Sequence, residues 1–184
     1  MLRLNFVGVC LIVALCGGLS QAQVVEPAAE HEHLKLDVGT WKATVKMWMG
    51  ADGQTDPNAE PMVSEGTEVN QMMGPFWMHS EFKGEFAGMP FEGKSVNGYD
   101  VNKKQYVGTW FDTFSPHALQ MTGTFDKDSR TFTYQTRGIG MDGKPTLGKS
   151  VATYPDKDHR EVKMYELKDG KELLSMQISY ERTK

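Results

Sequence analysis

Histidine and carboxylate side chains offer this chain its most direct route to acid/base chemistry. His79 and Glu81 alternate with Trp77, and residues two apart on a β-strand point to the same face of a sheet. If that face lined an interior, the imidazole and the carboxylate could exchange protons with a bound molecule. The same alternation, however, places Met78 and Phe82 on the apolar face. The pair is therefore expected on the outer surface, and an enzyme that uses it ranks third among the functions considered.

Two other kinds of side chain could bind a metal ion. His31 and His33 lie two residues apart, but nothing nearby in the sequence completes the three or four ligands that metal sites usually have. The chain contains 12 methionines, and their thioethers suit Cu(I). Several of them recur at every second residue among apolar neighbours, without a dense Met-x-x-Met cluster, which indicates packing around a core or cavity. These are Met47, Met49, Met78, Met121, Met164 and Met176. No metal and no cofactor is predicted.

The sequence lacks the common catalytic motifs. It contains no Gly-x-Ser-x-Gly, no His-Glu-x-x-His and no phosphate-binding loop. Gly138, Gly140 and Gly143 match a dinucleotide-binding pattern by letter, but they fall in a predicted hairpin turn with no helix after them. Both cysteines, Cys10 and Cys16, lie within the first 22 residues. Enzymatic activity is left open, and a non-catalytic role is favoured.

The elements that must position these residues are short segments in which apolar and polar residues alternate. Residues 40–49 show the pattern most clearly, with Trp41 and Val45 on one face and Lys42 and Lys46 on the other. Turn formers separate the segments, and the Asp-Gly pair at 169–170 is a strong hairpin signal. The expected strands are 40–49, 64–73, 76–86, 91–99, 104–112, 119–125, 131–137, 146–154, 161–167 and 172–182. A short helix is expected over 31–38.

Short turns between consecutive segments predict an all-β fold. No intervening stretch has the period and length of a crossover helix, so parallel βαβ units are not expected. A meander of about ten strands either stays open with two exposed edges or closes on itself, and closure removes the edges. We predict an up-and-down antiparallel meander closed into a β-barrel. A barrel of about eight to ten strands has room for one small ligand or a filled core.

The N-terminal segment has the features of an export signal. Residues 6–15 form an apolar run that is shorter than the roughly 20 residues needed to span a bilayer. Small residues before the cut predict signal-peptidase cleavage after Ala22. An uncleaved anchor and a lipoprotein lipidated on Cys16 are alternatives, but Leu15 is large for the position before a lipidated cysteine. The predicted organisation is a signal peptide at 1–22, a flexible lead-in at 23–30 and one domain at 31–184, periplasmic or secreted.

The number and distribution of charged residues exclude some classes of binding partner. The chain of 184 residues has a net charge of −4 with both signs interspersed, and it shows no basic patch for nucleic acid. No transmembrane span is expected in the mature chain. A small apolar molecule is the expected partner, and the sequence specifies no protein partner.

Four short motifs together resemble a known family. They are Val38-Gly39-Thr40-Trp41, Met72-Met73-Gly74-Pro75-Phe76, Gly98-Tyr99-Asp100, and Tyr106-Val107-Gly108-Thr109-Trp110-Phe111-Asp112. At this spacing, over residues 31–183, the chain resembles the bacterial lipocalin-like family catalogued as domain of unknown function 1579 (DUF1579). The resemblance implies a lipocalin-like, calycin-type barrel with no established activity, so it assigns no catalytic residue. Nitrobindin-like haem barrels also open on Gly-Thr-Trp, but they hold haem through a histidine near the C-terminus, and residues 172–182 contain none.

The favoured function is binding of a small, partly apolar molecule inside the barrel. Aromatic and methionine side chains occur on the strand faces expected to turn inward, as ligand pockets require. Asp112, two residues from Trp110, could hydrogen-bond that ligand at the barrel mouth or could instead cap the following turn. The residues predicted to line the site are Trp41, Phe82, Tyr99, Trp110, Asp112 and Met121. The alternative is a structural or interaction module of the cell envelope, with a packed barrel and its function on loops such as 52–61.

Overall fold

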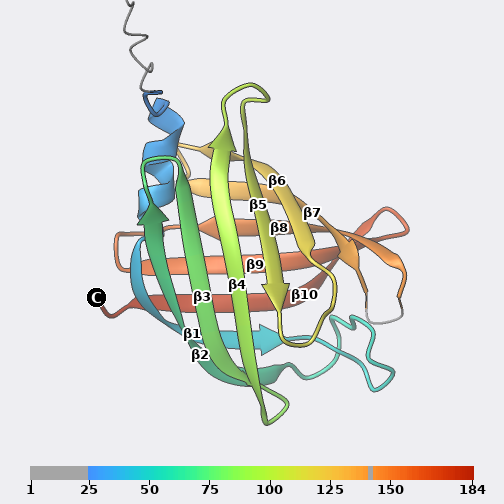
Figure 1. Ribbon diagram of the computed structural model, residues 1–184. Helices are drawn as coiled ribbons and strands as arrows, with labels where there is room; N and C mark the ends of the chain where they lie inside the picture. Colours follow the sequence, from blue (N-terminus) through green and yellow to red (C-terminus); the bar gives the residue numbers. More distant parts are fainter. Residues whose placement is uncertain (1–24, 141–142) are drawn as a thin grey trace, which may run out of the picture.

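Period-two alternation organises almost all of the described chain into strands. The computed structural model describes residues 25–140 and 143–184. Its strands (Figure 1) are β1 (Gly39–Met47), β2 (Met62–Met73), β3 (Trp77–Phe86), β4 (Met89–Asp100), β5 (Gln105–Asp112), β6 (Leu119–Asp126), β7 (Thr131–Ile139), β8 (Pro145–Thr153), β9 (His159–Lys168) and β10 (Lys171–Arg182). All ten expected strands are present, and each end lies within two residues of its expected position.

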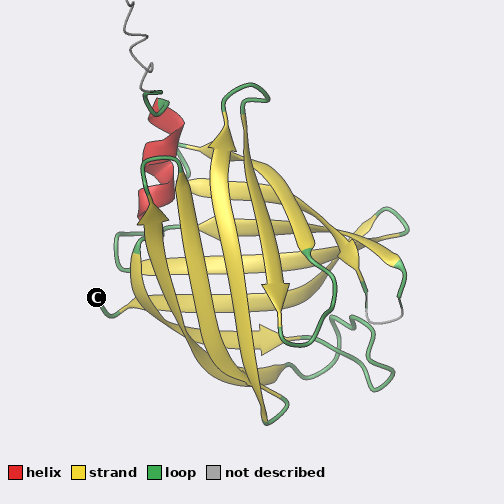
Figure 2. Ribbon diagram, viewed as in Figure 1, coloured by secondary structure: helices red, strands yellow, loops and turns green. Residues whose placement is uncertain are grey.

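The meander closes on itself. Each strand pairs antiparallel with the next along the chain, and β1 pairs with both β2 and β10. In the closing pair, Trp41 faces Arg182 and Met47 faces Met176 across the two strands. Closure leaves no unpaired strand edge, which is the physical reason we expected it. The predicted up-and-down antiparallel barrel is confirmed (Figure 2).

The turn between β9 and β10 shows how local chemistry sets the register. Asp169 and Gly170 adopt φ values of 51° and 74°. A two-residue hairpin turn of type I′ requires positive φ at both central positions, and Asp-Gly tolerates this conformation better than most pairs. The flanking residues Lys168 and Lys171 are then paired across the two strands.

A 3-10 helix, η1 (Ala29–Leu36), closes one end of the barrel. It lies beside the β2–β3 turn (Figure 1, blue), at the end of the barrel that we call the plugged end. Leu34 and His31 are 1% and 3% exposed, so the helix turns both side chains into the barrel. The ring of His31 packs edge-on against Phe76 and Tyr99, at centroid distances of 5.4 and 5.8 Å. The helix begins two residues before the expected 31–38 segment and ends at Leu36.

Buried side chains must face the interior, because the wall of the barrel is a single sheet with solvent outside. One apolar cluster fills the plugged end, where Leu34 from η1 meets Met78, Tyr106, Phe132 and Tyr154. A second cluster lies further along the barrel and contains Trp41, Ala43, Val45, Phe82 and Tyr180. The half of the interior next to η1 is therefore packed.

The predicted signal peptide over 1–22 lies outside the described residues. Within residues 25–140 and 143–184, no helix has the length and apolarity needed to cross a membrane. The stretch expected as a flexible lead-in, 23–30, contains the first two residues of η1.

Candidate functional site

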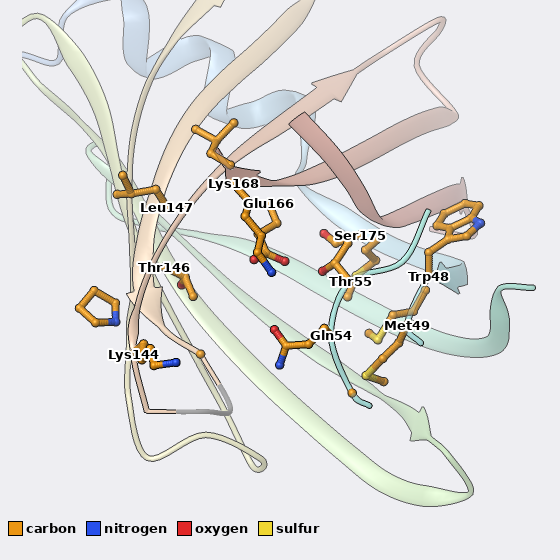
Figure 3. Close-up of a pocket in the computed structure, with 16 residues that line it drawn as sticks. Trp48, Met49, Gln54, Thr55, Lys144, Thr146, Leu147, Glu166, Lys168 and Ser175 are labelled. Atoms are coloured by element: carbon orange, nitrogen blue, oxygen red, sulfur yellow. The ribbon is translucent and has the colours of Figure 1, made fainter. Parts of the chain in front are cut away.

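The end of the barrel opposite η1 contains a cavity of about 820 Å³ (Figure 3). We call this the open end; it carries the β1–β2 loop over 48–61 and the β9–β10 turn. Side chains of the cavity wall come from the ends of β1, β8, β9 and β10 and from that loop. Its apolar part is formed by Met47, Trp48, Met49, Leu147, Leu167 and Met176. A cavity of this size matches the range that holds small organic ligands.

Backbone hydrogen bonds hold the β1–β2 loop against the cavity. The amide of Trp48 donates to the Ser175 carbonyl at 2.9 Å, which extends the β1–β10 pairing past the end of β1. Met49 and Thr55 form an isolated antiparallel bridge, and the amide of Gly50 donates to the Gln54 carbonyl at 2.8 Å. The loop is thereby folded back on itself as one wall of the cavity.

An irregularity in β10 shapes the same wall. The register of β9 against β10 shifts between Leu174 and Met176, so Ser175 is the extra residue of a β-bulge. Bulges at the rims of barrels redirect side chains. Ser175 donates its hydroxyl to the Met164 carbonyl at 3.0 Å and also lines the cavity.

Four methionines form a row across the open end. Met62, Met47, Met176 and Met164 are successive cross-strand partners on β2, β1, β10 and β9. Met47 and Met176 line the cavity, and Met164 is only partly buried. Directly opposed side chains lie close enough to touch, and thioether side chains adapt to irregular shapes. The row is a deformable apolar surface beside the cavity.

Small polar side chains are also buried inside the barrel. Ser80, Ser95, Thr136 and Ser150 are 5–8% exposed and come from β3, β4, β7 and β8. Ser80 and Ser95 are cross-strand partners, and Ser95 accepts a hydrogen bond of 2.8 Å from Asn97. Together with the methionine row, these hydroxyls make an interior that is mixed rather than purely apolar.

The six residues predicted to line a ligand site lie in different parts of the barrel. Trp41 is fully buried near the plugged end; its indole N–H donates to the Asp37 carbonyl at 2.7 Å, and the Arg182 guanidinium lies 3.9 Å from the ring centroid. Phe82 packs in the same cluster. Tyr99 packs at the plugged end, 5.0 Å from the ring of Tyr106. These three positions therefore belong to packed regions of the barrel.

Of the other three predicted residues, Trp110 packs against the same cluster as Trp41 and Phe82, and Asp112 and Met121 lie outside both clusters. The indole N–H of Trp110 donates to Asp112 Oδ2 at 2.9 Å. Asp112 Oδ1 accepts from the amides of Phe114 and Ser115 at 2.9 and 3.1 Å, so this carboxylate caps the β5–β6 turn. Met121 is partly buried and faces Thr136 across β6 and β7. None of the six lines the cavity of 820 Å³, and a ligand contact at these positions stays a prediction.

A buried ionic network, which no sequence pattern indicated, joins η1 to the barrel wall. Arg160 donates to Glu68 at 2.6 Å and to Asp37, and all three side chains are at most 15% exposed. Tyr180 donates to the second Glu68 oxygen at 2.9 Å, and Tyr154 donates to Asp37 at 2.7 Å. The expected strands 146–154 and 161–167 left Arg160 in the turn between them, but β9 begins at His159 and turns Arg160 inward. The expected placement of Arg160 in a turn was wrong.

The charges in this network depend on each other. Burial alone would raise the pKa of Glu68, but the charge and hydrogen bond of Arg160, with the hydrogen bonds of Asn70 and Tyr180, hold that pKa below its usual range. Burial opposes the charged form of Arg160 too, yet the carboxylates of Glu68 and Asp37 raise its pKa well above the ordinary value. The network connects Asp37, at the end of η1, to β2 and β9 and is best explained as the anchor of η1.

The histidines of η1 have separate, structural environments. His33 shares a hydrogen bond of 2.8 Å with the Tyr106 hydroxyl, which itself donates to the Glu30 carbonyl at 2.9 Å. Desolvation lowers the pKa of His33. His31 shares a hydrogen bond of 3.1 Å with the Ala28 carbonyl. Within the described ranges, no group of three or more His, Cys, Asp or Glu side chains is placed to hold a metal ion.

His79 and Glu81 lie on the outer face of β3, between the buried positions Met78, Ser80 and Phe82. Glu81 accepts a hydrogen bond of 2.9 Å from Lys94 on the neighbouring strand. That hydrogen bond and the charge of Lys94 lower the pKa of the Glu81 carboxyl. The pair is a surface feature, as the alternation predicted, and it does not reach the interior.

Two solved structures share the architecture. Rv2717c from M. tuberculosis matches with a TM-score of 0.63 at 12% identity, over 86% of this chain and 100% of that one. The S-type phycobiliprotein lyase CPES from Guillardia theta matches with a TM-score of 0.55 at 12% identity, over 85% and 94% of the two chains. At this identity the likeness shows the fold alone.

Comparison of the sequence itself identifies the family. No curated protein matches the chain. A family model described as "Protein of unknown function (DUF1579)" matches residues 26–182, which is most of the chain. The resemblance carried by the Gly-Thr-Trp, Gly-Tyr-Asp and Trp-x-Asp motifs is thereby confirmed, and the chain belongs to the DUF1579 family.

Proposed function

We propose that this chain is a binding protein that holds a small, partly apolar molecule at the open end of its barrel. The observation that carries the proposal is the asymmetry of the interior. The plugged end is filled by η1 and the first apolar cluster, whereas the opposite end contains a cavity of about 820 Å³, and the second cluster lies between them and reaches Met176 in the cavity wall. A barrel that served only as a rigid support would gain stability from a filled interior at both ends.

The cavity wall suits a ligand with both apolar and polar parts. Met47, Met176 and Leu147 offer apolar surface, while Gln54, Thr55 and Ser175 offer hydrogen-bonding groups. Ligand sites typically combine a mostly apolar lining with a few polar groups that fix orientation. The buried hydroxyl of Ser150, two residues from the strand partner of Glu166, would meet a ligand that extends toward the middle of the barrel.

The barrel architecture is compatible with this role. One structural neighbour is a phycobiliprotein lyase, and the shared feature is a barrel of similar topology. We also propose that the protein is exported, because residues 1–22 have the features of a cleaved signal peptide. The ligand would then be met in the periplasm or outside the cell.

Native mass spectrometry tests the binding function even when the ligand has not been identified. The mature protein is purified from the envelope of its own host and weighed under native and denaturing conditions. We expect an additional mass of a few hundred daltons that is lost on denaturation. Identical masses, together with an electron-density map in which side chains fill the open end, would instead support the packed structural module.

A further inference from the structure

The wall of the cavity at the open end contains one charged residue that is partly withdrawn from solvent. Lys144, Glu166 and Lys168 are the charged residues of its wall. Both lysines are exposed, whereas Glu166 is partly buried. Glu166 is therefore the least exposed charged residue of the cavity wall, and the two lysines are more exposed.

The register of β9 directs Glu166 to the interior. Arg160 on the same strand faces inward, and residues an even number of positions away share that face. Glu166 pairs with Gly148 on β8 and with Leu173 on β10, and Gly148 adds no side chain next to the carboxylate. In Figure 3, Glu166 lies among the stick-drawn side chains around the cavity, between Thr146 and Ser175. The Glu166 carboxylate therefore faces the cavity.

The Glu166 side chain has no ion-pair or hydrogen-bond partner within the described ranges 25–140 and 143–184. The ion pairs of these residues do not include it, and neither do their side-chain hydrogen bonds. By contrast, the buried carboxylate of Glu68 is compensated by Arg160, Asn70 and Tyr180. The Glu166 carboxylate is thus available to a ligand, and a bound cation would supply the counter-charge that Arg160 supplies to Glu68.

The surroundings of Glu166 suit an alkylated cation better than a bare metal ion. Met47 and Met176 from the methionine row line the same cavity and present thioether and methylene groups. Oxygen-binding metal ions require several oxygen ligands, and Glu166 is the one carboxylate of the cavity wall among the described residues. An organic ammonium needs a single counter-charge and apolar contacts for its carbon atoms.

We propose that the open-end cavity selects amphiphilic organic cations, with the ammonium nitrogen against Glu166 and the apolar remainder against the methionine row. This proposal rests on the binding function proposed above and names the ligand class of the same site. It predicts a preference set by charge among ligands that have equal apolar parts.

Competition with a neutral fluorescent probe, N-phenyl-1-naphthylamine, tests the preference. Three ligands with the same ten-carbon tail are compared: decyltrimethylammonium, decyl sulfate and the neutral decyl glucoside. Charge complementarity predicts that the cation displaces the probe at concentrations about tenfold lower than the other two. Rising salt should weaken displacement by the cation and leave the neutral ligand unchanged.

Variants distinguish the effect of the Glu166 carboxylate on ligand preference from the effect of charges elsewhere on the surface. Glu166→Gln should bring the cation to within about twofold of the neutral ligand, and Glu166→Lys should favour the sulfate. Glu161→Gln is the matched control, because Glu161 is on the same strand but pairs with Lys163 at 2.8 Å outside the cavity. That variant should keep the wild-type preference. Probe binding by each variant shows that it is folded.

The experiment distinguishes a failure of the proposed ligand class from a failure of the proposed binding function. Equal displacement by all three ligands, or a cation preference that survives Glu166→Gln, overturns the ligand class while probe binding leaves the proposed binding function intact. Absence of binding by the probe and by all three ligands overturns the binding function itself.

Discussion

At the scale of single residues, Arg160 and Glu68 show how this barrel tolerates charges inside it. Arg160 lies 5.1 Å from the ring centroid of Trp41 and 3.7 Å from that of Tyr180, so its guanidinium is stacked as well as ion-paired. Arg160 Nε and Asn70 Oδ1 are the buried polar atoms without a protein partner in the described residues. Removing one member of such a network leaves an uncompensated charge, which costs more than the pair itself contributes.

Glu68→Gln should therefore reduce the free energy of unfolding at pH 7 by about 3 kcal/mol. Because the pKa of Glu68 is lowered in the folded state, its contribution is present above the ordinary carboxyl pKa. It is lost as the pH falls through the lowered folded value. Urea unfolding at several pH values should show the wild-type advantage at pH 7 shrinking in acid.

Glu65→Gln is the control for this experiment, because Glu65 is exposed and pairs with Lys42 on the barrel surface. Its unfolding midpoint should match that of the wild type. A Glu68→Gln protein as stable as wild type at pH 7 would show that the buried network does not anchor η1.

Asp112 offers a second test at this scale, between ligand anchor and turn cap. Its carboxylate accepts three hydrogen bonds, from Trp110 and from the amides of Phe114 and Ser115. Asp112→Ala should lower stability by about 1–3 kcal/mol, since hydrogen bonds to a charged group are lost. Affinity for N-phenyl-1-naphthylamine should stay within about twofold of wild type, because the cap is outside the cavity. A large loss of affinity at unchanged stability would favour the anchor role.

At the scale of elements, η1 is the piece that distinguishes the two ends. Its Leu34 is 1% exposed, and the next residue, Lys35, is exposed. Leu34→Ala should cost about 2–5 kcal/mol, as expected for truncating a buried leucine. Lys35→Ala should change stability little. Amide hydrogen exchange should show faster exchange in η1 and at the plugged end of the Leu34 variant. Unchanged exchange there would show that η1 packs only loosely.

The strands could be predicted from the sequence because each carries its own signal. Alternation and turn residues act over a few positions, so segments such as 172–182 are recognisable in isolation. Closure followed from the need to remove strand edges. Trp41 and Phe82 were correctly expected inward, but their packing in a filled region depends on Tyr180, which is distant in the sequence.

The ionic network and the cavity could not be predicted in the same way. Asp37 and Arg160 are 123 positions apart and meet only after the barrel closes with the observed register. In the sequence, Glu166 is one charge among several on β9, and the bulge at Ser175 changes which residues of β10 share its face. Such features depend on long-range register, which no local pattern encodes.

At the scale of the whole molecule, the barrel has a packed interior at the end next to η1 and a cavity at the opposite end. Apolar side chains near its open rim remain exposed, among them Met62, Val63 and Met89. A protein that takes up partly apolar molecules needs such an entrance, and isolated exposed apolar side chains are otherwise common on soluble proteins. Binding of a small molecule should therefore be measured at the open end.

The most direct measurement is a titration of the mature protein with N-phenyl-1-naphthylamine, in wild type and in a variant that fills the cavity. We expect saturable binding with one site per chain, and a loss of affinity of at least about tenfold in Met176→Trp, because the indole would occupy the cavity. Met73→Trp, an equal substitution at an exposed position near the plugged end, should bind as wild type does. Wild-type affinity in folded Met176→Trp, or no saturable binding to any of the three proteins, would contradict a ligand site at the open end.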